Sequence, residues 1–185
     1  MLTLPRHLTY DDYRRIPDDG QRYEILDGEV YVNPSPTLAH QHASAALYLE
    51  LARAVSDDAR VYYAPIDVIL GEHDVVQPDL VVVATSQLTR RGIEGPPRIV
   101  VEIVSSGRPD FDRRIKARRY ASFGVPVYWL VAPSTRRVEC FHLVSDTYVL
   151  AAEGRDDEVI DAVGLEGVHL TLRPLWLELD VSPER

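Results

Sequence analysis

Two carboxylates stand alone in apolar segments of this chain. Asp79 follows Pro78 within residues 75–83, and Glu102 lies in the middle of residues 99–104. Burying a carboxylate costs several kcal/mol unless it is paired or binds a metal. For one such acid, an arginine salt bridge or a solvent-facing strand edge is the simpler interpretation. Two acids in successive strands favour a shared metal site, and these hard oxygen ligands suit Mg²⁺ or Mn²⁺.

The chain has a single lysine, Lys116, among 20 basic residues. An ammonium is a compact charge whose pKa can be lowered, whereas a guanidinium is planar and always protonated. A helical wheel of residues 110–123 predicts an inward side that contains Asp112, Ile115, Lys116, Arg119, Tyr120 and Phe123. Two interpretations follow: an ion pair with Asp112 whose lysine reaches out to solvent, or a lysine delivered to the carboxylate site.

Other side chains give weaker signals. Arg113, Arg114 and Arg118 leave the inward side of the same helix and could contact backbone phosphates, although a solvated face is an equal alternative. His40 stands near the start of a predicted helix, where a structural role is more common than metal binding. The sequence contains no G-x-S-x-G nucleophile motif and no glycine-rich phosphate loop.

The composition indicates one globular domain over residues 1–185, with 45% hydrophobic residues and a net charge of −9. Such an acidic chain is not suited to non-specific adhesion to nucleic acid, so DNA contact requires a local basic patch, a dimer groove or bound metal. A single cysteine excludes an internal disulfide framework. Without an apolar run that could span a bilayer or a signal peptide, we expect a cytoplasmic protein that contacts no membrane.

The pattern of apolar residues and turns predicts an α/β or α+β fold around a mixed sheet. A capped helix starts at Thr9, and a hairpin turns at Asp27-Gly28. Further helices are predicted at residues 38–55 and 110–123, and further strands at residues 61–70, 75–83, 99–104, 125–131, 137–143 and 147–152.

These residues carry a resemblance. Pro78-Asp79, Glu102-Ile103-Val104 and Lys116 resemble a PD-(D/E)xK nuclease site in which the lysine has moved from position 104 to the following helix. The chain from about residue 9 to residue 179 resembles the Uma-two family of restriction-endonuclease-like proteins. The matching stretches, in order, are residues 22–29, 33–36 with His40, 64–68, 76–80, 101–105, Asp112 with Lys116 and Tyr120, and 124–131.

The resemblance implies a restriction-endonuclease-like αβββαβ core with a mixed central sheet and extra strands at the C-terminus. It implies that Asp79 and Glu102 hold a divalent metal, Mg²⁺ or Mn²⁺, and that Lys116 faces the reacting phosphate. It also implies that Glu24 is an additional metal-site acid, which holds the metal through water or completes a second site. Accessory positions would be His40, Gln77, Asp112 and Tyr120.

The implied activity is metal-dependent hydrolysis of DNA phosphodiester bonds with no organic cofactor. Cutting both strands of a duplex needs two sites, so we expect a homodimer. The alternatives are a non-catalytic nucleic-acid-binding or accessory protein that keeps the fold, and a hydrolase of another phosphoester.

Overall fold

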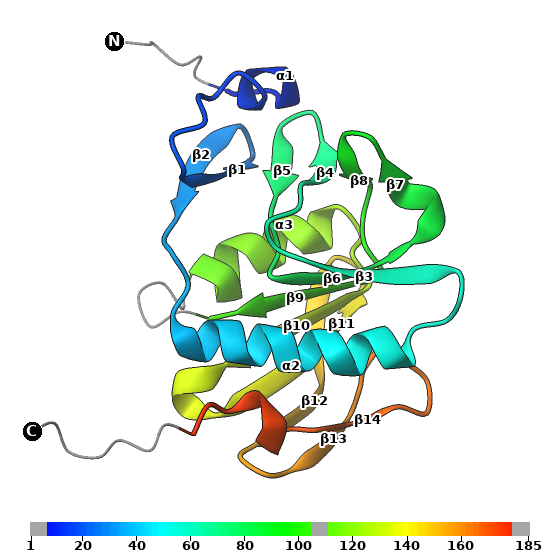
Figure 1. Ribbon diagram of the computed structural model, residues 1–185. Coiled ribbons are helices and arrows are strands. Elements are labelled where there is room, and N and C mark those ends of the chain that lie inside the picture. The colour runs from blue at the N-terminus through cyan, green and yellow to red at the C-terminus, as the bar shows by residue number, and fades with distance from the viewer. Residues whose placement is uncertain (1–6, 105–110, 179–185) are drawn as a thin grey trace, which may run out of the picture.

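The computed structural model describes residues 7–104 and 111–178, and of residues 111–113 it describes the backbone only. The strands β1 to β12 form two six-stranded sheets (Figure 1). The central sheet has, in spatial order, β12 (Thr147–Arg155), β11 (Arg137–Val144), β10 (Val127–Ala132), β9 (Ile99–Ile103), β6 (Leu80–Ala84) and β3 (Ala59–Tyr63). The N-terminal sheet has β2 (Glu29–Asn33), β1 (Arg22–Leu26), β5 (Asp74–Val76), β4 (Val68–Gly71), β8 (Gly92–Glu94) and β7 (Leu88–Thr89).

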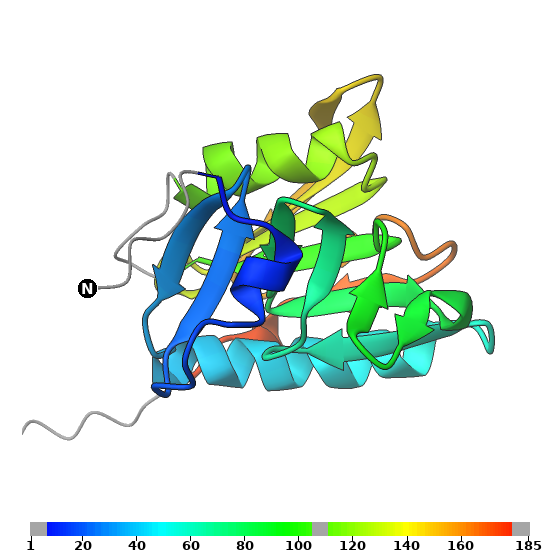
Figure 2. The ribbon, with the colours of Figure 1, turned by 90° about the horizontal axis from the view of Figure 1, so that it is seen from above.

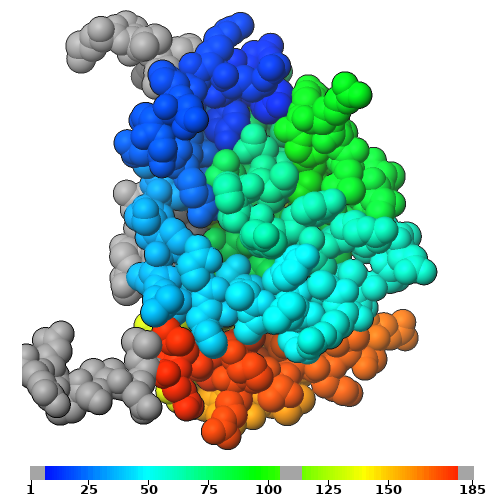
Figure 3. Space-filling view, in the orientation of Figure 1, coloured from blue at the N-terminus to red at the C-terminus, as the bar shows by residue number. Residues whose placement is uncertain are grey.

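Helices lie on both sides of the central sheet (Figure 2). The long helix α2 (Leu38–Ala54) covers one face, and α3 (Ala117–Ser122), preceded by a π-helical segment (Phe111–Lys116), covers the other. The remaining elements are α1 (Tyr10–Tyr13), the strand pair β13 (Val159–Asp161) and β14 (His169–Thr171), and 3-10 turns at Thr85–Gln87, Pro133–Thr135 and Arg173–Leu175. Figure 3 shows the N-terminal segment and the last strands at opposite ends of one face, with α2 between them.

The central sheet is mixed, as the sequence predicts. Strands β9 and β10 are parallel, and the other neighbours are antiparallel. A parallel pair needs a crossover connection, and the π-helical segment with α3 provides it. The additional strands β11 to β14 follow this core, where the resemblance places them.

Alternation along β6 and β9 divides the hydrophobic core into two layers. Leu80 and Val101 pack in the layer beneath α2, whereas Val81 and Val100 pack in the layer on the α3 side. Because side chains alternate between the faces of a strand, Glu102 shares the face of Val100. The carboxylate of Glu102 therefore lies on the α3 side of the sheet, where Tyr120 contacts it.

Two predicted strands are each divided in the structure. Residues 61–70 form the end of β3 and all of β4, with Ala64-Pro65 between them, because proline cannot donate to a strand ladder. Residues 75–83 form β5 and β6, which lie in different sheets, with Gln77-Pro78-Asp79 as the connection. The second break places Asp79 directly before β6 and beside its partner strand.

The helical wheel of residues 110–123 was wrong for Ile115, whose side chain is 45% exposed. The π-helix is the reason, since its wider turn shifts the phase of the residues before α3. Lys116 and Tyr120 are nevertheless buried. The predicted turn at Asp27-Gly28 is confirmed, with φ of 53° and 74°.

Cys140 is a buried free thiol, and burial raises its pKa to about 12. Within the described residues, no helix combines the length and the apolar character that crossing a bilayer requires.

Candidate active site

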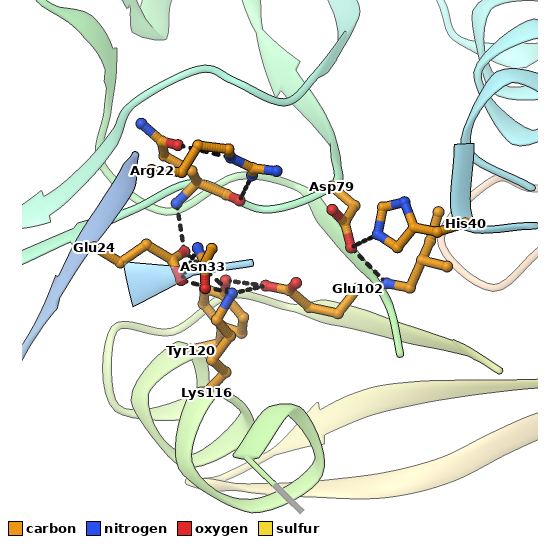
Figure 4. Close-up of polar contacts among 10 residues, drawn as sticks. Arg22, Glu24, Asn33, His40, Asp79, Glu102, Lys116 and Tyr120 are labelled. Atoms are coloured by element: carbon orange, nitrogen blue, oxygen red, sulfur yellow. Dashed lines mark hydrogen bonds and ion pairs between the residues drawn. The ribbon is translucent and has the colours of Figure 1, made fainter. Parts of the chain in front are cut away.

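Asp79 and Glu102 come together where β6 begins beside β9. Leu80 pairs with Val101 in antiparallel register, so Asp79, directly before β6, is brought beside the end of β9 that carries Glu102 and Ile103. Both carboxylates are buried and line one pocket (Figure 4). Only Glu102 lies on a strand, since Asp79 is in the connection directly before β6, and a metal ion shared by the two carboxylates stays a prediction.

The Asp79 carboxylate is held through one of its oxygens. Oδ2 accepts a hydrogen bond of 2.7 Å from the backbone N–H of Ile103 and lies 3.1 Å from Nε2 of His40. The His40 Nδ1 atom is buried with no hydrogen-bond partner among the described residues, which suits a neutral ring that donates from Nε2. All contacts of Asp79 within the described chain go to Oδ2, which leaves Oδ1 directed into the pocket (Figure 4).

Lys116 is buried and lies between two glutamates. Its Nζ atom is 3.1 Å from Oε1 of Glu102 and 3.0 Å from Oε2 of Glu24. The side chain is 4% exposed, so the interpretation as a lysine that reaches out to solvent was wrong. The side chain of Asp112, its predicted surface partner, lies outside the described residues.

Glu24, on β1, is fully buried behind Lys116. Its Oε1 accepts a hydrogen bond of 2.6 Å from the backbone N–H of Gln77, and its Oε2 accepts one of 2.8 Å from Nδ2 of Asn33. With Lys116, these donors engage both oxygens of the carboxylate. Glu24 is therefore placed to hold the lysine in position.

Tyr120 lies on α3, one turn after Lys116, and completes a buried polar cluster with Glu24, Glu102 and Lys116. Its hydroxyl donates a hydrogen bond of 2.6 Å to Oε1 of Glu102. Burial, and then the negative charge of Glu102, raise the pKa of Tyr120 well above its usual range. The hydroxyl therefore keeps its proton and remains a donor at neutral pH.

Arg119 anchors α3 against the N-terminal sheet. Its Nε and Nη2 atoms donate hydrogen bonds of 2.5 Å to the two oxygens of Asp74, which is buried on β5. Nη2 also lies 3.0 Å from Oδ1 of Asp27 in the hairpin turn. This bidentate pair fixes the helix that carries Lys116 and Tyr120. The sequence placed Arg119 on the inward side of its helix but gave no partner for it.

The pocket also includes two residues that the sequence analysis did not select, Arg22 and Asn33. They pair with each other in the β1–β2 ladder, and Glu24 lies two residues from Arg22 on the same face. A hairpin register fixed by Asp27-Gly28 could have placed Asn33 beside Glu24. The other lining residues are Pro34, Ser35, Pro36, His40, Gln77, Asp79, Glu102, Ile103 and Lys116.

The predicted phosphate-contacting arginines are partly described. Arg114 and Arg118 are exposed beside the buried Lys116, and neither lines the pocket. The side chain of Arg113 lies outside the described residues. Two basic groups are thus available at the surface of the helix that carries the lysine.

The donors in the pocket fit a hard divalent cation. The pocket is lined by the carboxylates of Asp79 and Glu102 and by the cations of Arg22 and Lys116. With the buried Glu24 beside Lys116, the carboxylates outnumber the cations by one. Within the described chain, no cluster of three or more His, Cys, Asp or Glu side chains has metal-binding geometry. Mg²⁺ commonly takes one or two carboxylates and completes its shell with water and substrate phosphate. Asp79 and Glu102 match that smaller requirement.

Comparisons with known proteins bear on the fold and the family of the chain. No curated protein sequence matches the chain. One similar solved structure is a crystal structure described as a putative nuclease belonging to DUF820 from Anabaena variabilis. It is 17% identical, has a TM-score of 0.72, and the match covers 91% of this chain and 97% of that one. This likeness shows a shared fold.

A sequence-family model covers nearly the whole chain. The model is Uma2, described as "Putative restriction endonuclease", and it matches residues 10–173. The matched range contains the buried acids, the lysine and every strand of both six-stranded sheets. On the strength of that match, the chain belongs to the Uma2 family.

Proposed function

We propose that this protein is a metal-dependent endonuclease that hydrolyses DNA phosphodiester bonds. The observation that carries the proposal is the buried Lys116 ammonium, held by Glu24 and Glu102 in the pocket that Asp79 also lines. A buried ammonium among carboxylates is costly to maintain, so a site of this kind favours a chemical role over a stabilising one. The family description and the nuclease-like fold support the same class of activity.

In this proposal, Asp79 and Glu102 would hold Mg²⁺ or Mn²⁺ in the pocket. When bound, the metal supplies a Lewis acid and lowers the pKa of a coordinated water. Lys116 would orient the attacking water or stabilise the charge that builds on the phosphate oxygens. Glu24 and Tyr120 are positioning residues in this scheme, since the former fixes Lys116 and the latter fixes Glu102.

The substrate class follows from the charges beside the pocket. The chain as a whole is acidic, but positive charge is present at the site. It comes from Arg22 in the pocket lining and from the exposed Arg114 and Arg118 beside Lys116. Phosphate contacts by such arginines position a DNA strand without reading its sequence. We propose in addition that the protein acts as a homodimer, because cutting both strands of a duplex needs two sites.

A non-catalytic DNA-binding or accessory protein is the second candidate. The net charge of −9 favours the accessory role, because such a chain repels DNA outside its local basic residues. Binding without cleavage would support this candidate, whereas metal-dependent cleavage supports the first.

The deciding experiment incubates the purified protein with supercoiled plasmid and with single-stranded DNA in Mg²⁺, Mn²⁺ or EDTA. An Asp79→Asn protein purified identically controls for contaminating nucleases. We expect nicking or cleavage with metal, and none with EDTA or with Asp79→Asn. Equal cleavage by the wild type and Asp79→Asn, or activity in EDTA, contradicts the proposal.

A further inference from the structure

A second cavity lies beside the active-site pocket. It has a volume of about 370 Å³ and shares Arg22 and Gln77 with that pocket. Its other walls include Tyr13 and Ile16 from the first helix and its exit, Tyr23 from β1, and Pro65 from the loop after β3. We call it the Tyr13–Tyr23 pocket. All of its lining residues lie in the described part of the chain.

The walls of this pocket suit a flat, uncharged group. Two tyrosines, an isoleucine and two prolines supply apolar surface, and the positive group is Arg22 on the shared wall. Asp18 lines the pocket, and Asp19 accepts a hydrogen bond of 2.6 Å from the Tyr23 hydroxyl. These carboxylates disfavour a second phosphate but can accept hydrogen bonds from the amino groups of a nucleobase.

One hydrogen-bond network joins the Tyr13–Tyr23 pocket to the active site. Gln77 Nε2 donates to Asp67 and to the hydroxyl of Tyr13, and the same hydroxyl donates to Asp67 at 2.7 Å. Burial raises the pKa of Tyr13, which keeps that hydroxyl protonated as a donor.

On its other side, the same glutamine reaches the catalytic cluster. Its Oε1 accepts a hydrogen bond from Arg22 Nε at 3.2 Å, and its backbone N–H donates to Glu24. The wall between the two pockets is therefore a hydrogen-bonded structure that links a phosphate-sized site to a larger one with both apolar and polar walls.

We propose that the Tyr13–Tyr23 pocket receives an unstacked nucleobase of the DNA strand whose phosphate occupies the active-site pocket. This inference rests on the proposed function and extends it to a preference for single-stranded or locally distorted DNA. A base inside a duplex cannot reach such a pocket unless it leaves the stack, which costs least in single strands and at mismatches. Stacking on aromatic side chains then recovers free energy with every base.

The test measures binding in EDTA, so it does not depend on cleavage. A fluorescently labelled single-stranded oligonucleotide is titrated with wild type, Tyr23→Ala, Tyr23→Phe and Tyr63→Ala. Tyr63 is an exposed tyrosine on β3 that lines neither pocket, so its substitution is a matched control. We expect Tyr23→Ala to weaken binding about 5- to 100-fold, and Tyr23→Phe and Tyr63→Ala to bind like the wild type.

A second set of oligonucleotides carries one abasic nucleotide at successive positions. When the abasic nucleotide stands at the position that enters the Tyr13–Tyr23 pocket, we expect the wild type to bind it more weakly, by a factor similar to that of Tyr23→Ala. We expect the Tyr23→Ala variant to bind this abasic oligonucleotide and the intact one equally. Ile16→Trp, which fills the pocket without removing a hydrogen bond, provides an independent block and is expected to weaken binding likewise. Thermal melts confirm that each variant is folded.

Unchanged binding by both Tyr23→Ala and Ile16→Trp overturns the inference, as does an equal loss with Tyr63→Ala. The inference is also overturned if the loss from an abasic nucleotide adds to the loss from Tyr23→Ala at every position. It is overturned as well if the wild type does not bind the oligonucleotide. Tyr23-dependent binding without cleavage in Mg²⁺ or Mn²⁺ would instead support the nucleobase pocket while contradicting the nuclease proposal.

Discussion

Lys116 Nζ lies 3.1 Å from Oε1 of Glu102, although the lysine belongs to the helical crossover and the glutamate to the middle of a strand. A lysine two residues after the acid would lie on the same face of the strand. Here Val104 occupies that position, and the ammonium that contacts Glu102 comes instead from the helical segment after β9. The contact shows that a lysine from the helical crossover reaches the carboxylate of Glu102.

Replacing Lys116 by arginine tests whether the ammonium takes part in the reaction. We expect Lys116→Arg to lower the cleavage rate at least about a hundredfold, because a planar, bulkier guanidinium misplaces the charge at the reacting phosphate. The measurement is a single-turnover cleavage assay with Mn²⁺. Cleavage by Lys116→Arg at a near wild-type rate contradicts the catalytic role.

Thermal melts separate that effect from folding. Lys116→Arg keeps the positive charge between Glu24 and Glu102, and its cost is that of overfilling a packed site, about 1–3 kcal/mol. Lys116→Met removes the cation that lies between two buried carboxylates, so we expect a larger loss of about 3–5 kcal/mol.

Asp79 is expected to bind the metal through the oxygen that faces the pocket. Calorimetric titration with Mn²⁺ should show binding to the wild type and none, or at least tenfold weaker binding, to Asp79→Asn. A ligand that binds only the folded protein stabilises it, so Mn²⁺ should raise the melting temperature of the wild type alone. Equal Mn²⁺ stabilisation of both proteins would exclude Asp79 as a ligand.

The parts of the site that were predictable from sequence are those fixed by local pattern. Lone acids in apolar runs identified Asp79 and Glu102, and the unusual single lysine identified Lys116. The partners of these residues depend on contacts between distant segments. Asn33 at Glu24 follows from the hairpin register around Asp27-Gly28, whereas Asp74 at Arg119 has no local signature because that pair is a helix–sheet contact.

The fold divides in the same way. Alternation and turn residues predicted the first hairpin, β9 and the β11–β12 pair. The hydrophobic pattern did not predict that β3 and β4 belong to different sheets. Both are apolar strands, and only a short connection that contains Pro65 separates them. The π-helix was unpredictable from a wheel that assumes a constant turn.

Arg114 and Arg118 are expected to contact DNA phosphates. We expect the double substitution Arg114→Ala/Arg118→Ala to weaken binding of all DNA sequences similarly and to reduce the slope of log affinity against log salt by about 1.4–1.8. The control is Arg53→Ala/Arg173→Ala, which removes two mostly exposed arginines away from the pocket and should leave the slope nearly unchanged. Equal slopes for the two double variants would mean that the helix arginines do not meet phosphates.

Arg119 should contribute more to stability than any exposed ion pair, because its partner Asp74 is 1% exposed. Arg119→Ala leaves that carboxylate buried without its cation, and we expect a loss of about 3–5 kcal/mol in urea unfolding. Arg119→Lys keeps a charge but cannot make the bidentate contact, so an intermediate loss is expected. Arg53→Ala, which breaks an exposed pair with Glu50, should cost no more than about 0.5 kcal/mol.

A double-mutant cycle separates the Arg119–Asp74 interaction from the packing of either side chain. If the pair is the anchor of α3, Arg119→Ala and Asp74→Ala together should cost clearly less than the sum of the single losses. Because the same helix carries Lys116 and Tyr120, Arg119→Ala should also lower the cleavage rate at temperatures where the protein remains folded. Additive losses in the cycle, with cleavage unchanged, would show that α3 is held in place by its hydrophobic packing instead.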